Sequence, residues 1–168
     1  MAMIDPGWVR MMARYNAWQN RSLRREVALL SDGEARAERG AFFGTILGTA
    51  NHLLWGDEMW LSRFADHPKP AGGIAESVAL TPDVAAWSAR RGTVDDAIST
   101  WAEGLSDCEG DVTWWSGVLG REARMPKDRL FTHFFNHQTH HRGQLHAMLT
   151  AAGRRPDDTD LFAMPEDA

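Results

Sequence analysis

Histidines gather in one segment of this chain, Phe131-Thr-His-Phe-Phe-Asn-His-Gln-Thr-His-His-Arg-Gly-Gln-Leu-His146. Five of the seven histidines among the 168 residues lie in it. Imidazole is the commonest metal-binding side chain near neutral pH. Two imidazoles four residues apart on a helix share one face, so both can reach the same ion. That spacing occurs at His133 and His137, and again at His137 and His141.

The helix that carries this segment is predicted to run over residues 126–152, with Gly153 just beyond its end. An α-helix turns by about 100° per residue. Taking His137 as the origin, the apolar side chains of the helix fall on one arc, between roughly 20° and 80°. These core-facing positions are Leu130, Phe134, Leu145, Met148 and Ala152.

The same construction sorts the histidines. His141 lies in the middle of the apolar arc and His137 lies on its edge. His133 and His140 turn away from the arc, and His146 points to the opposite side. The pair predicted to face the core is therefore His137 and His141. Metal sites in helical bundles are built from such inward side chains on facing helices.

Three further helices are predicted from capping residues, prolines at helix starts and helical apolar spacing, over residues 6–30, 42–64 and 82–105. Residues 112–125 are rich in Gly and Trp and partly alternate, which predicts a short hairpin around residues 117–120, between the third and fourth long helices. The segment from Arg154 onward is expected to be irregular. The sequence thus predicts an all-α four-helix bundle in a single domain, residues 1–168.

Composition excludes several classes of function. A net charge of -5 and a pI near 5.8 argue against a nucleic-acid partner, which requires clustered Lys and Arg. Polar residues interrupt every apolar run, so neither a signal peptide nor a membrane span is predicted. The single cysteine, Cys108, lies among acidic residues that disfavour a reactive thiolate. A lone cysteine suits a reducing cytoplasm, which is the expected location.

A third metal ligand has two candidates, His52 and His67. His67 stands between Asp66 and Pro68, which predicts a loop. His52 lies mid-helix, and the small residues one turn away leave space around its imidazole. Close packing between helices explains those small residues equally well, and a buried histidine is often an ordinary core residue. Spacing alone therefore leaves metal binding and ordinary packing open.

Four segments resemble motifs of one family, the DinB/YfiT-like four-helix-bundle metalloproteins. The last-helix segment is Asn136-His-Gln-Thr-His-His-Arg-Gly-Gln144, and the second-helix segment is Asn51-His-Leu-Leu-Trp-Gly-Asp57. Tyr15-Asn-Ala-Trp-Gln-Asn20 and Asp158-Thr-Asp-Leu161 resemble the family's first-helix motif and its usual close. The resemblance implies that His52, His137 and His141 bind a divalent metal, often nickel or zinc. It also implies a homodimer.

Family members include S-transferases that use a low-molecular-weight thiol such as bacillithiol or mycothiol. The resemblance therefore implies a metal-bound thiolate that attacks an electrophilic small molecule, a chemistry that a three-histidine site with an open position permits. Weaker candidates for lining the pocket are Asn16, Asn20, Trp55 and Gln144, for which packing or surface exposure is the competing explanation. Arg142, beside a ligand, is interpreted as a surface arginine.

Partners for the second imidazole nitrogens are expected among Asp57, Glu58 and Gln138. No nucleotide-binding loop or serine triad occurs in the sequence. The Glu-x-x-His spacing of ferritin-like di-iron bundles is also missing, which disfavours that class of metal site. Two alternatives to the transferase stay open. One is a non-catalytic, stress- or damage-inducible metal-binding protein that acts as a helical homodimer, and the other is a partner-binding helical dimer without metal.

Overall fold

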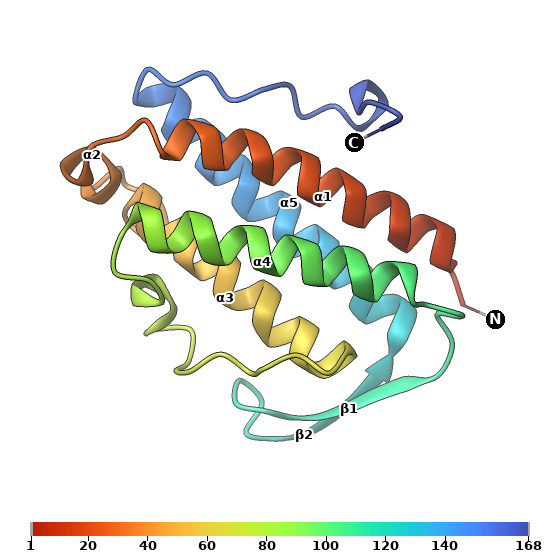
Figure 1. Cartoon of the computed structure of the whole chain (residues 1–168). Helices are drawn as coiled ribbons and strands as arrows, with labels where there is room; N and C mark the ends of the chain where they lie inside the picture. Colours follow the sequence, from red (N-terminus) through yellow and green to blue (C-terminus); the bar gives the residue numbers. More distant parts are fainter. Residues whose placement is uncertain (1, 168) are drawn as a thin grey trace.

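Four long helices lie side by side and form the body of the protein, in a computed structural model that describes residues 2–167 (Figure 1). They are α1 (Pro6–Val27), α3 (Ile46–Phe64), α4 (Val84–Glu103) and α5 (Lys127–Ala151). The most extensive helix contacts join α1 to α4 and α3 to α5. The predicted all-α four-helix bundle is confirmed.

Capping side chains set where the long helices begin. The Asp5 carboxylate accepts a hydrogen bond from the Trp8 amide, as the Asp-Pro start predicted. The Asp83 carboxylate does the same for α4. The prediction for α3 was wrong at its start, because Thr45 is the cap and α3 begins four residues later than expected. Gly44 has a positive φ of 73°, which keeps the two preceding phenylalanines in a turn outside the helix.

Three short elements were not predicted. The helix α2 (Asp32–Arg36) begins at Ser31, whose side chain and that of Glu34 form a reciprocal capping box. The first helix was predicted to end at residue 30, whereas α1 ends at Val27 and Ser31 caps this short second helix. The turn η1 (Ser77–Ala79) lies between the second and third predicted helices, and η2 (Leu161–Ala163) lies in the C-terminal segment predicted as irregular.

A two-stranded hairpin lies beside the bundle, near the end of α3 (Figure 1). Its antiparallel strands are β1 (Asp111–Ser116) and β2 (Arg121–Pro126), joined by the predicted turn. β1 contacts α3, and β2 leads directly into α5. The Trp114 ring of β1 packs edge-on against Trp60 of α3, with centroids 5.6 Å apart. The hairpin thus places tryptophans beside the end of α3.

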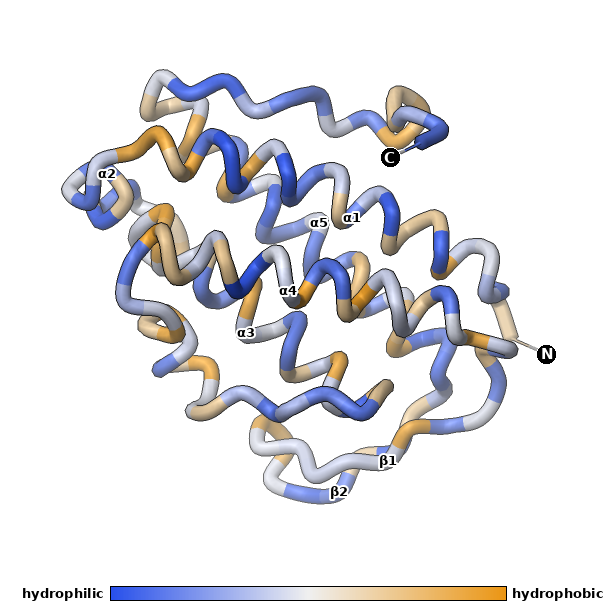
Figure 2. Tube along the Cα trace, in the orientation of Figure 1, coloured by the Kyte–Doolittle hydropathy of each residue, from blue (hydrophilic) through white to orange (hydrophobic). Residues whose placement is uncertain are grey.

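The C-terminal segment runs back along α1 (Figure 1) and is mostly hydrophilic (Figure 2). Several hydrogen bonds attach it to α1, among them those of Tyr15, Gln19 and Ser22. The Tyr15 hydroxyl donates to the Thr159 carbonyl, Gln19 donates to the Asp158 carbonyl, and the Asp157 amide donates to Ser22. These polar contacts explain how a segment without a large apolar face stays on the bundle.

Side chains from all four long helices build one hydrophobic core, which includes Leu53, Trp87, Ile98, Phe134 and Leu145. Nearly the whole circumference of α3 is buried within this one chain. The many apolar side chains of α3 are therefore buried without a second subunit, and the expected homodimer stays a prediction. No helix between residues 2 and 167 is long and apolar enough to cross a membrane.

A network of charged and polar side chains is buried inside the bundle. The Arg91 guanidinium, fully buried on α4, lies 2.6 Å from the Asp57 carboxylate of α3 and 2.9 Å from that of Asp95. Asn20 of α1 donates to Asp95 over 2.8 Å, and Gln138 of α5 donates to Asp57 over 3.1 Å. All four long helices therefore contribute to one polar network around Arg91.

Removing Arg91 is expected to destabilise the protein strongly. Arg91→Met leaves two buried carboxylates without their cation, which typically costs about 3–5 kcal/mol of unfolding free energy. Arg124→Met is a matched control, because Arg124 also pairs with a carboxylate, Asp111, but its side chain is 73% exposed. The control should lose about 1 kcal/mol or less. Urea unfolding of both variants measures the difference, and equal losses would contradict the structural role of Arg91.

Candidate metal centre

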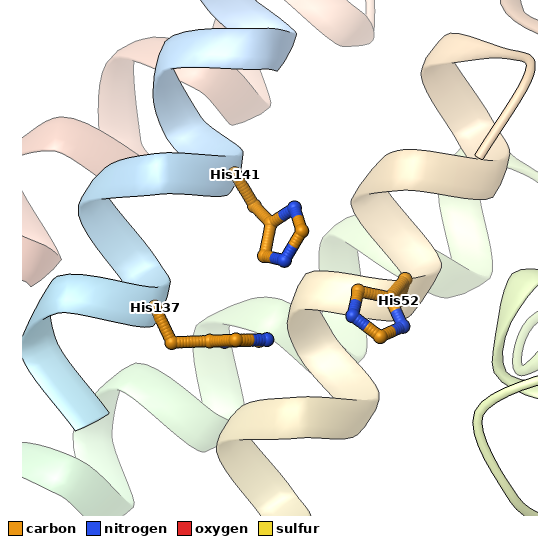
Figure 3. Close-up of side chains that lie close together, drawn as sticks. All are labelled: His52, His137 and His141. Atoms are coloured by element: carbon orange, nitrogen blue, oxygen red, sulfur yellow. The ribbon is translucent and has the colours of Figure 1, made fainter. Parts of the chain in front are cut away.

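Three histidine side chains from two helices converge beside the core (Figure 3). His52 comes from α3, and His137 and His141 come from successive turns of α5. One ring nitrogen from each lies within 4.8 Å of the others. His133 lies beside Trp60 and His140 is exposed, so neither joins this group. The structure thus brings together the three histidines that the sequence singled out.

Hydrogen bonds orient two of the three imidazoles. Nδ1 of His52 lies 2.8 Å from the Ser77 hydroxyl, which itself donates to the Ile74 carbonyl and so accepts from the ring. Nδ1 of His141 lies 2.8 Å from the Gln144 side-chain oxygen, which can only accept. Both rings therefore carry their proton on Nδ1 and leave the Nε2 lone pair free for another partner.

The third imidazole has a nitrogen without a partner. Nδ1 of His137 is buried and forms no hydrogen bond within residues 2–167. A buried polar atom without a partner costs free energy, and in folded proteins a bound ion or water commonly satisfies such an atom. This unsatisfied nitrogen belongs to the same group of three, so it fits a ligand that the side chains alone do not supply.

Burial keeps the three imidazoles neutral at pH 7. Desolvation, assisted by the neighbouring His141, lowers the pKa of His52 to about 4. Desolvation, with the other histidines, lowers the pKa of His137 to about 3. Desolvation also lowers the pKa of His141, against the Gln144 hydrogen bond. Neutral imidazoles are the form that binds metals, so no proton has to leave these rings near neutral pH.

A family model places the chain among known proteins: the model of the DinB family matches residues 3–168. The chain belongs to the DinB family. A solved DinB-like protein from Bacillus cereus is 18% identical, with a TM-score of 0.61, over 84% of this chain and 90% of that one. At this identity the likeness concerns the fold alone. None of the curated proteins matches the chain.

The weaker pocket candidates of this DinB-family chain divide into two pairs. Trp55 and Gln144 line the cavity beside the three histidines. Asn16 and Asn20 do not line it, because both are buried in the polar network, where each donates to the Asp95 carboxylate. The first-helix motif places Asn16 and Asn20 on the inward side of the bundle. It does not specify whether an inward side chain lines the cavity or joins the polar network.

Arg142 is a correction. It was interpreted as a surface arginine, but it is only 5% exposed and donates a hydrogen bond to Asn16. Burial is the main cause that lowers its pKa to about 10, so it stays charged at pH 7. Asn16 and Arg142 therefore interact with each other, and neither lines the cavity beside the three histidines.

The expected imidazole partners were also placed incorrectly. Asp57 and Gln138 bond to each other, and Glu58 pairs with Arg90. The partners found are Gln144, one turn along α5, and Ser77, which lies in a connecting segment far along the chain. Another missed contact is Phe43, whose ring stacks on His52 with centroids 3.7 Å apart. No spacing rule links Ser77 or Phe43 to His52, so only the folded chain reveals them.

The three histidines open into a cavity of about 620 Å³. Aromatic and aliphatic side chains form most of its wall, among them Phe43, Trp55, Met59, Trp60 and Ile74. A cavity of this size accommodates a small organic molecule, and apolar walls with few polar groups are typical of ligand sites. The candidate centre thus borders a space large enough for a small molecule.

Gly56 makes room for one of the three candidate imidazoles, that of His137. A Cβ atom at this position of α3 would lie 2.6 Å from Cε1 of His137 and 3.3 Å from its Nδ1. Such a contact is far shorter than atoms tolerate, so a side chain here would displace the imidazole. The sequence had indicated free space around His52, whereas the space at Gly56 is occupied by His137.

Gly56→Ala is expected to weaken the binding of added zinc by about tenfold or more, because ligand displacement typically costs that much affinity. Its helix should be as stable as before or slightly more, since Ala favours helix over Gly by about 1 kcal/mol. Gly143→Ala on α5 is the matched control, because a Cβ there meets no atom within 4 Å. Competition titration against a chromophoric chelator measures both, and unchanged affinity in Gly56→Ala would refute the steric role.

Proposed function

We propose that this DinB-family protein binds one divalent metal ion, nickel or zinc, through His52, His137 and His141. The observation that carries the proposal is the convergence of three neutral imidazoles, their ring nitrogens within 4.8 Å of one another. The partnerless Nδ1 of His137 supports it, as do the acceptors that fix the protons of the other two rings. Three imidazoles suit zinc and nickel.

We further propose that the bound ion serves thiol-dependent S-transfer to an electrophilic small molecule. A divalent ion held by three protein ligands keeps an open position and lowers the pKa of a thiol or water beside it. In the transfer, the thiolate sulfur forms a bond to the electrophilic carbon, the leaving group departs with its electron pair, and the thiol proton passes to solvent. The apolar cavity beside the histidines supports the proposal, because it can hold the electrophile and exclude water.

The residues of this chain have separable tasks in the proposal. Ser77 and Gln144 hold His52 and His141 in the tautomer that presents Nε2. Phe43 stacks on His52 and excludes solvent from one face of its ring. Trp55 and Met59 line the space in which the electrophile would lie. In the alternative of a non-catalytic metal-binding protein, the same three histidines bind the metal, but the cavity has no role.

Metal content is the first measurement. Untagged wild-type protein is expected to carry about one equivalent of nickel or zinc, bound tightly enough to survive purification. His137→Ala/His141→Ala should lose it, because two of three ligands are gone. His140→Ala/His146→Ala is the matched control on the same helix, since neither histidine belongs to the group of three, and it should keep the metal. Elemental mass spectrometry reads all three, and equal metal in both double variants would exclude this site.

Thiol transfer is tested with the metal-loaded protein. It is expected to accelerate the reaction of bacillithiol, mycothiol or glutathione with monobromobimane above the spontaneous rate, for at least one of the three thiols. The acceleration should vanish in His137→Ala/His141→Ala and persist in His140→Ala/His146→Ala. Fluorescence of the bimane adduct measures the rate. A protein that binds metal but accelerates none of the reactions would support the non-catalytic alternative.

A further inference from the structure

The cavity at the three histidines continues toward the hairpin. A second cavity, also of about 620 Å³, is lined by residues of α3, the following segment and the hairpin turn. The two cavities share six lining residues, and we call these and the space between them the aromatic groove: Trp55, Met59, Trp60, Arg63, Ile74 and Val118. Five of the six are apolar or aromatic, and the exception is Arg63.

The charge of the groove differs from that of the protein. The chain has 23 acidic and 18 basic residues, yet neither cavity has a carboxylate among its described lining residues. Two permanently charged residues line the two cavities. Arg63 lines both of them, and Lys69 lines the second. A cleft of one charge sign with apolar walls concentrates ligands of the opposite sign. The groove is therefore suited to anions, although the protein as a whole is acidic.

Arg63 lies over aromatic rings, with its Cζ 4.2 Å from the Trp60 centroid and 5.3 Å from that of Trp114. Other arginines of the chain, such as Arg90 and Arg124, have a carboxylate oxygen 2.7 Å away. Within the described chain, no carboxylate oxygen lies within 4 Å of Arg63. Burial lowers its pKa to about 10, so the guanidinium stays charged at pH 7. A half-buried cation thus faces the groove without a protein counter-ion.

We propose that the aromatic groove binds apolar carboxylates, with the carboxylate on Arg63 and the aryl or alkyl body against Trp55, Met59 and Trp60. Guanidinium pairs with carboxylate through parallel hydrogen bonds, and the flat indole walls provide contact for an apolar body. The inference rests on the proposed function in one respect: it assigns the electrophilic substrate to this class. Binding in the groove does not itself require the metal.

Direct binding tests the proposal on metal-free protein, where a carboxylate cannot bind to an ion instead. Isothermal titration compares hydrocinnamate with its neutral amide, hydrocinnamamide, and with the cationic phenylpropylamine. Hydrocinnamate is expected to bind about tenfold or more tightly than the amide, because hydrogen bonds to charged groups contribute that much. The amine should bind most weakly. Quenching of tryptophan fluorescence provides a second readout, since four tryptophans line the two cavities: Trp55, Trp60, Trp114 and Trp115.

Arg63→Met should abolish the preference for hydrocinnamate over its amide while leaving amide binding within about twofold, because Met retains much of the apolar stem. Arg63→Lys should keep part of the preference, since it preserves the charge but not the planar fork. Arg121→Met on the exposed strand β2 is the matched control. It changes the net charge by the same amount and should leave the preference intact.

Three results would overturn the proposal: no binding of hydrocinnamate to wild-type protein, equal binding of acid and amide, or equal effects of Arg63→Met and Arg121→Met. The failure of the metal proposal looks different. Protein that takes up no metal but still prefers hydrocinnamate through Arg63 would retain the groove and lose the transferase. Protein that takes up metal at the histidines but shows no such preference would retain the metal site and lose the substrate class.

Discussion

The ion pairs of Arg91 constrain the rest of the structure. A guanidinium and two carboxylates buried in a small bundle are stable only when each finds its partner, because desolvation of an unpaired ion is costly. Asp57 is on α3, Arg91 and Asp95 are on α4, and the amides that satisfy the carboxylates come from α1 and α5. A helix displaced by one turn would separate a charge from its partner. Hydrophobic packing alone tolerates such shifts more readily, so the network selects one arrangement of the helices.

That arrangement fixes the candidate metal ligands through their neighbours in sequence. Gln138 follows His137 and bonds to Asp57 on α3, while Arg142 follows His141 and bonds to Asn16 on α1. Each candidate ligand on α5 is thus next to a residue that hydrogen bonds to the network hold in place. Successive helical residues point about 100° apart, so α5 directs its amide and guanidinium toward the network and its imidazoles toward the groove. The polar network and the candidate centre therefore lie against two different faces of α5.

Much of this could be predicted from the sequence, and the failures have a common physical cause. Periodicity and capping residues determine helices locally, which explains why the start of α1 and both ends of α5 were predicted to within one residue. A helical angle sufficed to select His137 and His141 from five histidines. Contacts between distant segments leave no such periodic trace. Ser77 reaches His52 from a connecting segment, and Arg142 is buried because Asn16 of another helix accepts its hydrogen bond. The burial of an arginine depends on its partner, which the local sequence does not specify.

The three imidazoles are held by different means, and the difference determines which way the centre faces. Acceptors on Ser77 and Gln144 fix the Nδ1 protons of His52 and His141, so hydrogen bonding turns their Nε2 atoms away from those partners. His137 has no such acceptor, and its ring lies instead where the absent side chain of Gly56 leaves room. Phe43 covers one face of His52, while the walls formed by Trp55, Met59 and Trp60 begin next to the same rings. The three histidines and Arg63 therefore line the same cavity, so the proposed carboxylate site and the candidate metal centre share one space.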